Sequence, residues 1–294
     1  MSGNILKFGK FNISMIEAGL VRLDGGAMFG VVPRVLWERH FPPDEKNRIQ
    51  MTTNLLLITS GNRRVLVDTG IGHKFDEKFY NIYAVDFSEK NLDRSLKALG
   101  LTFEDITDVI LTHLHFDHTG GATAKDPDGT VRPTFPNAVY YVQKQQYEWA
   151  FEGNEKDRAS YFAENYKPLR DAGQLKFLEG PGEILPGIEV IVVNGHTPAQ
   201  QLPVIDGGSR KLLFAADLIP THSHIPVPWV MAYDVEPLTT IEEKKLWLEV
   251  AEKEEWLIFF EHDPQVHLAT VERSEKGYRL GKEMPFTELG SFSG

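Results

Sequence analysis

The chain has 294 residues, of which 31 are Lys or Arg and 42 are Asp or Glu, so that its formal net charge is −11, and it contains no cysteine. The absence of cysteine excludes disulfides, thiolate zinc sites, iron–sulfur clusters and cysteine nucleophiles, but not metal sites built from His and Asp. The negative charge argues against a nucleic acid or an anionic membrane as partner, because both are bound chiefly through Lys and Arg.

Segments rich in β-branched and aromatic residues alternate with helical patterns along the whole chain. The former predict strands at residues 12–16, 54–59, 64–68, 108–112, 138–142, 175–178, 188–193, 202–205, 211–215 and 256–260. The latter predict helices at residues 92–99, 144–151, 158–172 and 241–253. Glycine and proline at residues 180–182 and 185–187 indicate turns. Because both halves combine strand pairs with helices, we expect one α/β sandwich domain, residues 1–294, with its helices outside.

The segment 23–51 is the exception, since it is long, weakly periodic and rich in closely spaced apolar residues. Loops of this length are usually lids or interaction segments, so we expect a lid or a dimerisation segment, and a homodimer. Residues 1–19 lack the apolar core of a signal peptide, and the longest apolar runs, such as 256–260, have five residues. We therefore expect a cytoplasmic protein without a membrane span.

The strongest chemical signal follows the predicted strand 108–112, where residues 113–118 read HLHFDH. His113 and His115 share one direction if the strand continues, because side chains alternate along a strand. Asp117 and His118 then fall on the turn, where they can point to a second ion. A solvated or packed histidine-rich turn is the alternative interpretation, but four nitrogen or oxygen donors within six residues favour a metal cluster.

Three later predicted strands also end in metal-ligand residue types. The first runs into His196, the second ends at Asp217, and the third is followed by His262. Each alone is more often structural, but together with the HxHxDH stretch they indicate one metal centre. Imidazoles and carboxylates without thiolates suit Zn, Fe, Mn or Co.

The order of these motifs resembles the metallo-β-lactamase superfamily, with Asp68 in the Val-Asp-Thr-Gly stretch as its first signature. The resemblance implies an αββα sandwich of two mixed β-sheets and two divalent metal ions, zinc first, with Fe, Mn or Co open. It implies three sets of ligands: His113, His115 and His196 for one ion, Asp117, His118 and His262 for the other, and Asp217 as the bridge.

The same resemblance implies a nucleophilic hydroxide between the metals, since such sites lower the pKa of bound water toward about 7. Asp117 would also act as the general acid and base. Asp68 would lie behind the ligands and fix the tautomer of a histidine; its alternative role is that of a turn residue.

Residues 24–30, Phe116 and residues 217–221 resemble the N-acyl homoserine lactonases and their phosphotriester-hydrolysing relatives. This implies that the centre opens a lactone or ester of a small molecule with an apolar portion. We expect the substrate pocket to be lined by Met28, Phe29, Phe116, Trp229 and Met231, although the core uses the same residue types.

One position departs from the lactonases, which carry a Tyr three residues after the bridging Asp. Pro220 stands there in this chain. The substrate carbonyl would then be polarised by the metal alone or by a substitute, for which His222, His224 and Tyr233 are the candidates in the pocket wall.

Other functions share the fold or the motif. A phosphotriesterase or phosphodiesterase could use the same site, and an iron-dependent sulfur dioxygenase or a non-catalytic metal-binding module are further alternatives. The net charge of −11 argues against a nuclease. The presence of His115 argues against a diiron oxygen-reducing protein, which would carry Glu at that position. The chain has no Walker A loop, no GxSxG elbow and no complete GxGxxG, because Phe75 replaces the third glycine. We expect His40, His73 and His267 to be structural or surface residues.

Overall fold

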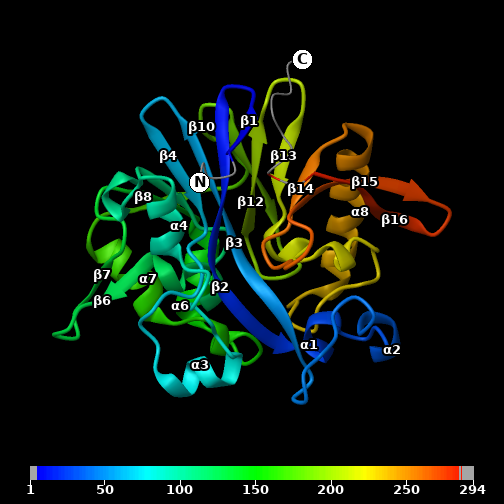
Figure 1. Ribbon diagram of the computed structural model, residues 1–294, viewed down its shortest axis with the longest axis horizontal. Coiled ribbons are helices and arrows are strands. Elements are labelled where there is room, and N and C mark those ends of the chain that lie inside the picture. The colour runs from blue at the N-terminus through cyan, green and yellow to red at the C-terminus, as the bar shows by residue number, and fades with distance from the viewer. Residues whose placement is uncertain (1–4, 285, 287–294) are drawn as a thin grey trace.

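Two seven-stranded sheets pack face to face in the computed structural model, which describes residues 5–284 and 286 (Figure 1). In spatial order the first sheet contains β1 (Ile5–Phe8), β2 (Phe11–Asp24), β3 (Arg48–Ser60), β4 (Arg63–Val67), β5 (Asp108–Ile110), β8 (Val139–Gln143) and β9 (Leu175–Leu178). β1 to β4 pair antiparallel, whereas β4, β5, β8 and β9 pair in parallel. The first sheet is therefore mixed.

The second sheet comes from the C-terminal half of the chain. In spatial order it contains β10 (Gly182–Leu185), β11 (Ile188–Val193), β12 (Gln200–Asp206), β13 (Lys211–Phe214), β14 (Leu257–Phe259), β15 (Leu268–Ser274) and β16 (Gly277–Glu283). Only β13 and β14 pair in parallel, because the long helix α8 (Pro237–Lys253) connects them. A small hairpin of β6 (Thr123–Lys125) and β7 (Val131–Pro133) stands apart from both sheets.

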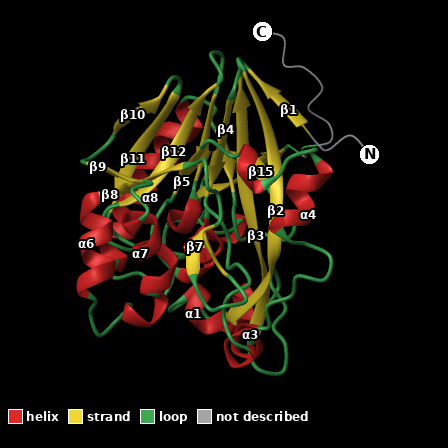
Figure 2. Cartoon of the chain, turned by 90° about the vertical axis from the view of Figure 1, so that its left-hand side faces the viewer, coloured by secondary structure: helices red, strands yellow, loops and turns green. Residues whose placement is uncertain are grey.

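Helices cover the outer faces of the two sheets, as Figures 1 and 2 show. On the side of the first sheet lie α3 (Glu77–Tyr83), α4 (Leu92–Ala98), α6 (Lys144–Glu152) and α7 (Ala163–Asp171), and α8 covers the second sheet. Three short helices, α1 (Gly25–Phe29), α2 (Arg34–Trp37) and α5 (Phe116–Thr119), lie in connections. This is the expected αββα sandwich, and no helix in the described part of the chain is long and apolar enough to span a bilayer.

The side chains of β3 explain the layering. Its residues 51–58 are all buried, which is the pattern of a strand covered on both faces. Leu55 and Leu57 join the core between the first sheet and its helices, whereas Leu56 and Ile58 join the core between the two sheets. Alternation with period two thus places one strand in two cores.

The structure corrects several expected elements. Six of the described strands were not predicted: β1, β6, β7, β10, β15 and β16. β1, β6 and β7 have only three or four residues, charged residues interrupt the apolar pattern of β15 and β16, and β10 lies between two turn signals. The helix expected at residues 158–172 is broken into a 3₁₀ turn, Arg158–Ser160, and α7. Tyr161 lies between the two, and its hydroxyl is 2.7 Å from Thr197 Oγ1, so a tertiary contact interrupts the helix.

The segment 23–51 is not one loop. It comprises the end of β2, the short helices α1 and α2, and the beginning of β3. Leu23, Met28 and Met51 from this segment line the cavity described below. The segment therefore forms part of a wall, and its role in dimerisation stays a prediction.

Candidate metal centre

The centre forms where strands of both sheets end. β4 and β5 run in parallel, so Asp68, which follows β4, lies beside the chain that leaves β5. The Asp68 carboxylate accepts hydrogen bonds from the backbone N–H of Thr112 at 2.7 Å and from its hydroxyl at 2.6 Å. Asp68 has a φ of 57°, a conformation that Asp adopts more readily than most residues. The first signature of the sequence thus anchors the loop that carries the histidines.

Gly120 and Gly121 allow the chain after these histidines to pass close to the neighbouring loop. A Cβ atom would lie 1.9 Å from the Ile71 carbonyl oxygen at Gly120 and 2.1 Å from the Thr69 carbonyl oxygen at Gly121. The two glycines are needed for close approach of backbones. This packing fixes the short helix α5, which carries Asp117 and His118.

Four donors gather in the first cluster. His115 Nδ1 lies 3.0 Å from His113 Nε2 and 3.1 Å from His196 Nε2, and His196 Nε2 lies 3.1 Å from Asp217 Oδ2. The strand β5 ends at Ile110, so His113 and His115 lie in the following loop rather than on a continued strand. His115 presents Nδ1 to the cluster, whereas His113 and His196 present Nε2.

Asp117, His118 and His262 form the second cluster. The Nε2 atoms of His118 and His262 are 3.2 Å apart, and the Asp117 oxygens lie 3.9 to 4.0 Å from them. Asp217 Oδ1 lies 3.1 Å from His262 Nε2 and 3.5 Å from His118 Nε2. Asp217 therefore directs one carboxylate oxygen to each cluster, and all seven side chains expected to be ligands come together.

Hydrogen bonds on the outer side of four histidines leave a lone pair on the inner nitrogen. The Nδ1–H groups donate to four acceptors: Thr112 Oγ1 for His113 at 3.1 Å, Asp68 Oδ2 for His118 at 3.0 Å, Asp234 Oδ1 for His196 at 3.0 Å, and the Thr52 carbonyl for His262 at 2.9 Å. An outer acceptor of this kind selects the tautomer and orients the ring of a metal ligand.

The histidines of the centre fall into two groups by the direction in which their pKa values are shifted. Burial, followed by the neighbouring imidazoles, holds the pKa of His113 and of His115 well below 6.5. Burial also lowers the pKa of His196 and of His262, but this effect is outweighed by nearby carboxylates, chiefly that of Asp217. The pKa of each of the two histidines is therefore raised to about 9. The same histidines, with His118, overcome the effect of burial on Asp217 and keep its pKa well below 3.8.

The donor sets fit divalent metal ions. Ligand nitrogens 2.0–2.1 Å from a tetrahedral ion are about 3.3 Å apart, and the closest nitrogen pairs here are separated by 3.0 to 3.2 Å. Inner lone pairs facing one another at this distance repel unless a proton or a metal ion lies between them. Asp217 Oδ1 is buried without a hydrogen-bond partner, which is also expected of a ligand atom.

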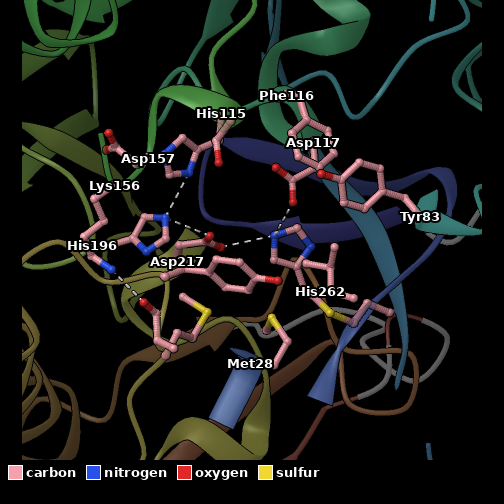
Figure 3. A pocket seen from close by; sticks show the side chains of 16 residues that line it. Met28, Tyr83, His115, Phe116, Asp117, Lys156, Asp157, His196, Asp217 and His262 are labelled. Atoms are coloured by element: carbon pink, nitrogen blue, oxygen red, sulfur yellow. Dashed lines mark hydrogen bonds and ion pairs between the residues drawn. The ribbon is translucent and has the colours of Figure 1, made fainter. Parts of the chain in front are cut away.

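A cavity opens on the exposed side of the two clusters (Figure 3). It holds about 710 Å³ of empty space when the part open to solvent is included, and about 140 Å³ in which the centre of a water molecule fits. Its lining falls into three groups: the cluster residues His115, Asp117, His196, Asp217 and His262; the apolar Leu23, Met28, Met51, Phe116 and Met231; and the polar or small Tyr83, Tyr233, Lys156, Asp157, Ser160 and Ala232.

Four of the eight side chains expected to line the pocket do so in the structure. Met28, Phe116, Met231 and Tyr233 line the cavity, and Phe29, His222, His224 and Trp229 do not. Phe29 is fully buried and stacks between Trp37 and His224, at ring-centroid distances of 5.4 and 4.7 Å.

The other three side chains have structural partners instead. His224 Nε2 donates to the Met28 carbonyl at 2.8 Å, His222 Nδ1 lies 2.5 Å from Asp263 Oδ2, and the edge of Trp229 packs on Phe29. These three side chains therefore do not line the cavity, and their contact with a substrate stays a prediction.

Sequence reasoning missed two carboxylates next to the centre, Asp234 and Glu261. Glu261 ends the apolar run 256–260, and an acidic residue at the end of such a run was a signal that could have been used. Asp234 lies 38 residues after the histidine it contacts, in a segment without regular structure, and no sequence pattern points to it. Burial and the charge of Asp68 raise the pKa of Glu261 to about 8, although His118 opposes this shift.

Comparison with known proteins identifies the family. The model of the metallo-β-lactamase superfamily matches residues 49–262. The chain belongs to this superfamily. It is 31% identical over 212 residues to the N-acyl homoserine lactonase AiiA of Bacillus thuringiensis subsp. kurstaki, an alignment that covers 68% of this chain and 76% of that protein.

Solved structures agree in fold. A probable metal-dependent hydrolase from Staphylococcus aureus is 29% identical, with a TM-score of 0.84 over 95% of this chain and 100% of its own. AidC, a dizinc quorum-quenching lactonase, has a TM-score of 0.78 over 95% of this chain and 97% of its own, and at 22% identity it supports the fold alone. With the family model and the relatives, these comparisons establish a metal-dependent hydrolase of the metallo-β-lactamase superfamily.

Proposed function

We propose that the protein is a dinuclear metal-dependent hydrolase that opens a lactone or an ester with an apolar portion. The observation that carries this proposal is the cavity, which has the two donor clusters at one side and an apolar wall of Met28, Met51, Phe116 and Met231 at another. The similarity to N-acyl homoserine lactonases supports the same substrate class.

Divalent ions bound at the clusters would polarise the carbonyl and lower the pKa of water toward about 7. Zinc is the ion we propose first, with Fe, Mn and Co as alternatives that the same donors accept. His113, His115 and His196 would hold one ion, Asp117, His118 and His262 the other, and Asp217 would bridge the two. Asp68 would hold the ring of His118 in place.

Asp117 is the group that we propose to carry a proton. Its carboxylate lines the cavity, and the Tyr83 side chain points toward it (Figure 3). Burial, and next the charge of Asp117, raise the pKa of Tyr83, so this hydroxyl stays protonated and can donate to the carboxylate. Asp117 could then accept a proton from water and return it to the leaving oxygen.

Tyr233 is the substitute that we propose for the tyrosine replaced by Pro220. It lines the same cavity as the clusters, whereas His222 and His224 do not. Burial raises the pKa of Tyr233 above its usual value, which keeps the hydroxyl a hydrogen-bond donor for a substrate carbonyl.

The proposed partners are a small-molecule substrate and a second copy of the chain. Val31, Val35 and Leu36 next to or within α2 are 93%, 60% and 42% exposed, and these apolar side chains support a homodimer. A monomeric mass in solution would contradict the dimer. The cytoplasmic location stays a prediction.

A substrate panel with defined metal content tests the function. Purified protein loaded with Zn²⁺, Mn²⁺, Co²⁺ or Fe²⁺ would be assayed on lactones of increasing acyl length, aryl esters, thioesters, β-lactams, phosphotriesters and phosphodiesters. We expect the highest kcat/KM on a lactone or ester with an apolar chain. A preference for a phosphoester over every lactone and ester would contradict the proposal and favour the phosphotriesterase or phosphodiesterase alternative.

A further inference from the structure

The two donor clusters differ in the charge that lies behind them. In the first, His113 is backed by the neutral hydroxyl of Thr112, His196 by the Asp234 carboxylate, and the outer nitrogen of His115 is buried without a hydrogen-bond partner. The first cluster therefore has one carboxylate behind three histidines.

The second cluster has more carboxylates in and behind it than the first. Asp117 belongs to the cluster itself, and two carboxylates lie on the outer side of His118. Asp68 Oδ2 and Glu261 Oε2 are each 3.0 Å from His118 Nδ1, which carries a single proton. Asp68 also accepts two hydrogen bonds from Thr112, so it is the better-placed acceptor.

Glu261 is therefore a surplus carboxylate. Its side chain is fully buried, and apart from the approach of Oε2 to His118 Nδ1, whose proton goes to Asp68, neither of its oxygens has a hydrogen-bond partner. Burying a carboxylate without partners is costly, so such a group is expected to be compensated by a nearby positive charge. The second cluster lies directly beyond the His118 ring, because Nε2 of that ring faces the cluster while Nδ1 faces Glu261.

We propose that Glu261 is a positioning residue that makes the Asp117–His118–His262 position the stronger of the two cation sites. A divalent ion beyond the His118 ring opposes the burial that raises the pKa of Glu261, so the side chain is a carboxylate when that ion is bound. Its charge then acts through the His118 ring, which becomes a better donor at Nε2, and through the field at the ion. The ion held there is bound first, and the ion held by His113, His115 and His196 exchanges more readily. This inference rests on the two-ion centre of the proposed function.

Stepwise binding of Co²⁺ to metal-free protein tests the proposal, measured from the visible absorption of bound cobalt in competition with a chelator. His115→Ala and His262→Ala each impair one position and assign the binding steps. We expect the wild type to bind two ions with unequal affinity, the tighter step being the one lost in His262→Ala.

Glu261→Gln and Asp234→Asn form a matched pair, because each removes one outer carboxylate and preserves its shape. Glu261→Gln should weaken the tighter step by about 10- to 100-fold and leave the weaker one nearly unchanged, and Asp234→Asn should do the reverse. Circular dichroism of each metal-free variant confirms folding, and Glu261→Ala replaces Glu261→Gln if the latter does not fold.

Three results would overturn the inference: unchanged affinities in Glu261→Gln, a loss confined to the weaker step, or a single binding step in the wild type. The titration uses no substrate. Failure of the protein to open lactones would therefore contradict the proposed function and leave the ranking of the two positions standing, so the two failures are distinguishable.

Discussion

The metal centre and the wall of the cavity are built in different ways. The centre takes its donors from the ends of strands, and hydrogen bonds to nearby backbone and carboxylates fix each ring. The wall comes from segments about 200 residues apart, since Met28 of α1 and Met231 face the same space. The Ala232 N–H donates to the Ala27 carbonyl at 2.8 Å, and the buried Lys244 donates to the Trp229 carbonyl at 2.7 Å.

This difference separates two kinds of effect. Residue type determines whether the centre can bind an ion, so changes there should remove the reaction. The packing of distant segments determines the shape of the wall, so changes there should alter which substrate is selected and how stable the segments are. Four predictions test this division, beginning with the largest expected effect.

Removal of the Asp217 carboxylate, which we propose as the bridge, should abolish activity. Asp217→Ala deletes the group that faces both clusters, and the lost metal-assisted stabilisation of several kcal/mol corresponds to a decrease in kcat/KM of about 1,000-fold or more. His115→Ala should act in the same direction. Elemental analysis should show less bound metal in both variants. Unchanged kinetics in either would show that the ligand assignment is wrong.

Asp68→Asn should weaken metal binding without removing it. Asn tolerates the φ of 57° at this position, so the substitution removes the charge and leaves the backbone unstrained. Because Asp68 accepts the Nδ1–H of His118, we expect the affinity for Co²⁺ to fall by about 10- to 100-fold. Chelator competition measures this change, and wild-type affinity would mean that Asp68 is only a turn residue.

Met231→Ala should change substrate selection and leave the metal content unchanged. Loss of an apolar contact should raise KM for substrates with a long acyl chain by about 10-fold, with little effect on short ones. Leu246→Ala is the matched control, because that side chain is 54% exposed and does not line the cavity. An equal change in KM for short and long chains would argue against an acyl-binding wall.

Acidic pH should lower the free energy of unfolding through His224, which holds the wall of the cavity at Met28. Burial lowers the pKa of this imidazole to about 3, despite its bond to the Met28 carbonyl, against about 6.5 in an unfolded chain. Between these values the unfolded chain binds more protons, so the contribution of His224 to stability is present above pH 6.5 and is lost as the pH falls toward 3.

His224→Gln isolates this contribution from those of the other histidines. Gln can donate to the Met28 carbonyl and accept from Thr221, so the hydrogen bonds have substitutes. In urea unfolding, the stability advantage of the wild type over the variant should shrink between pH 7 and pH 4. A constant difference would show that His224 does not titrate in this range.

Much of the fold could be predicted because its strands are short, apolar and bounded by turn residues. The missed strands are those whose pattern is obscured by charge, such as β15 and β16 at the end of the second sheet. The helix expected at 158–172 shows the limit of local patterns, since the contact between Tyr161 and Thr197 breaks it. The local sequence around Tyr161 carries no information about a contact with a residue 36 positions away.

The sequence by itself determined the family and predicted the seven candidate donors, because the HxHxDH stretch and three strand-end residues are fixed in type and order. Only the tertiary structure decided which nitrogen of each ring faces the centre and which carboxylates stand behind the rings. Asp234 and Glu261 became visible only when the chain was folded. The wall likewise required the structure, because the same apolar residue types occur in the core and in the lining of a cavity. Only the packing of distant segments places Met28 at the cavity and buries Phe29 against His224.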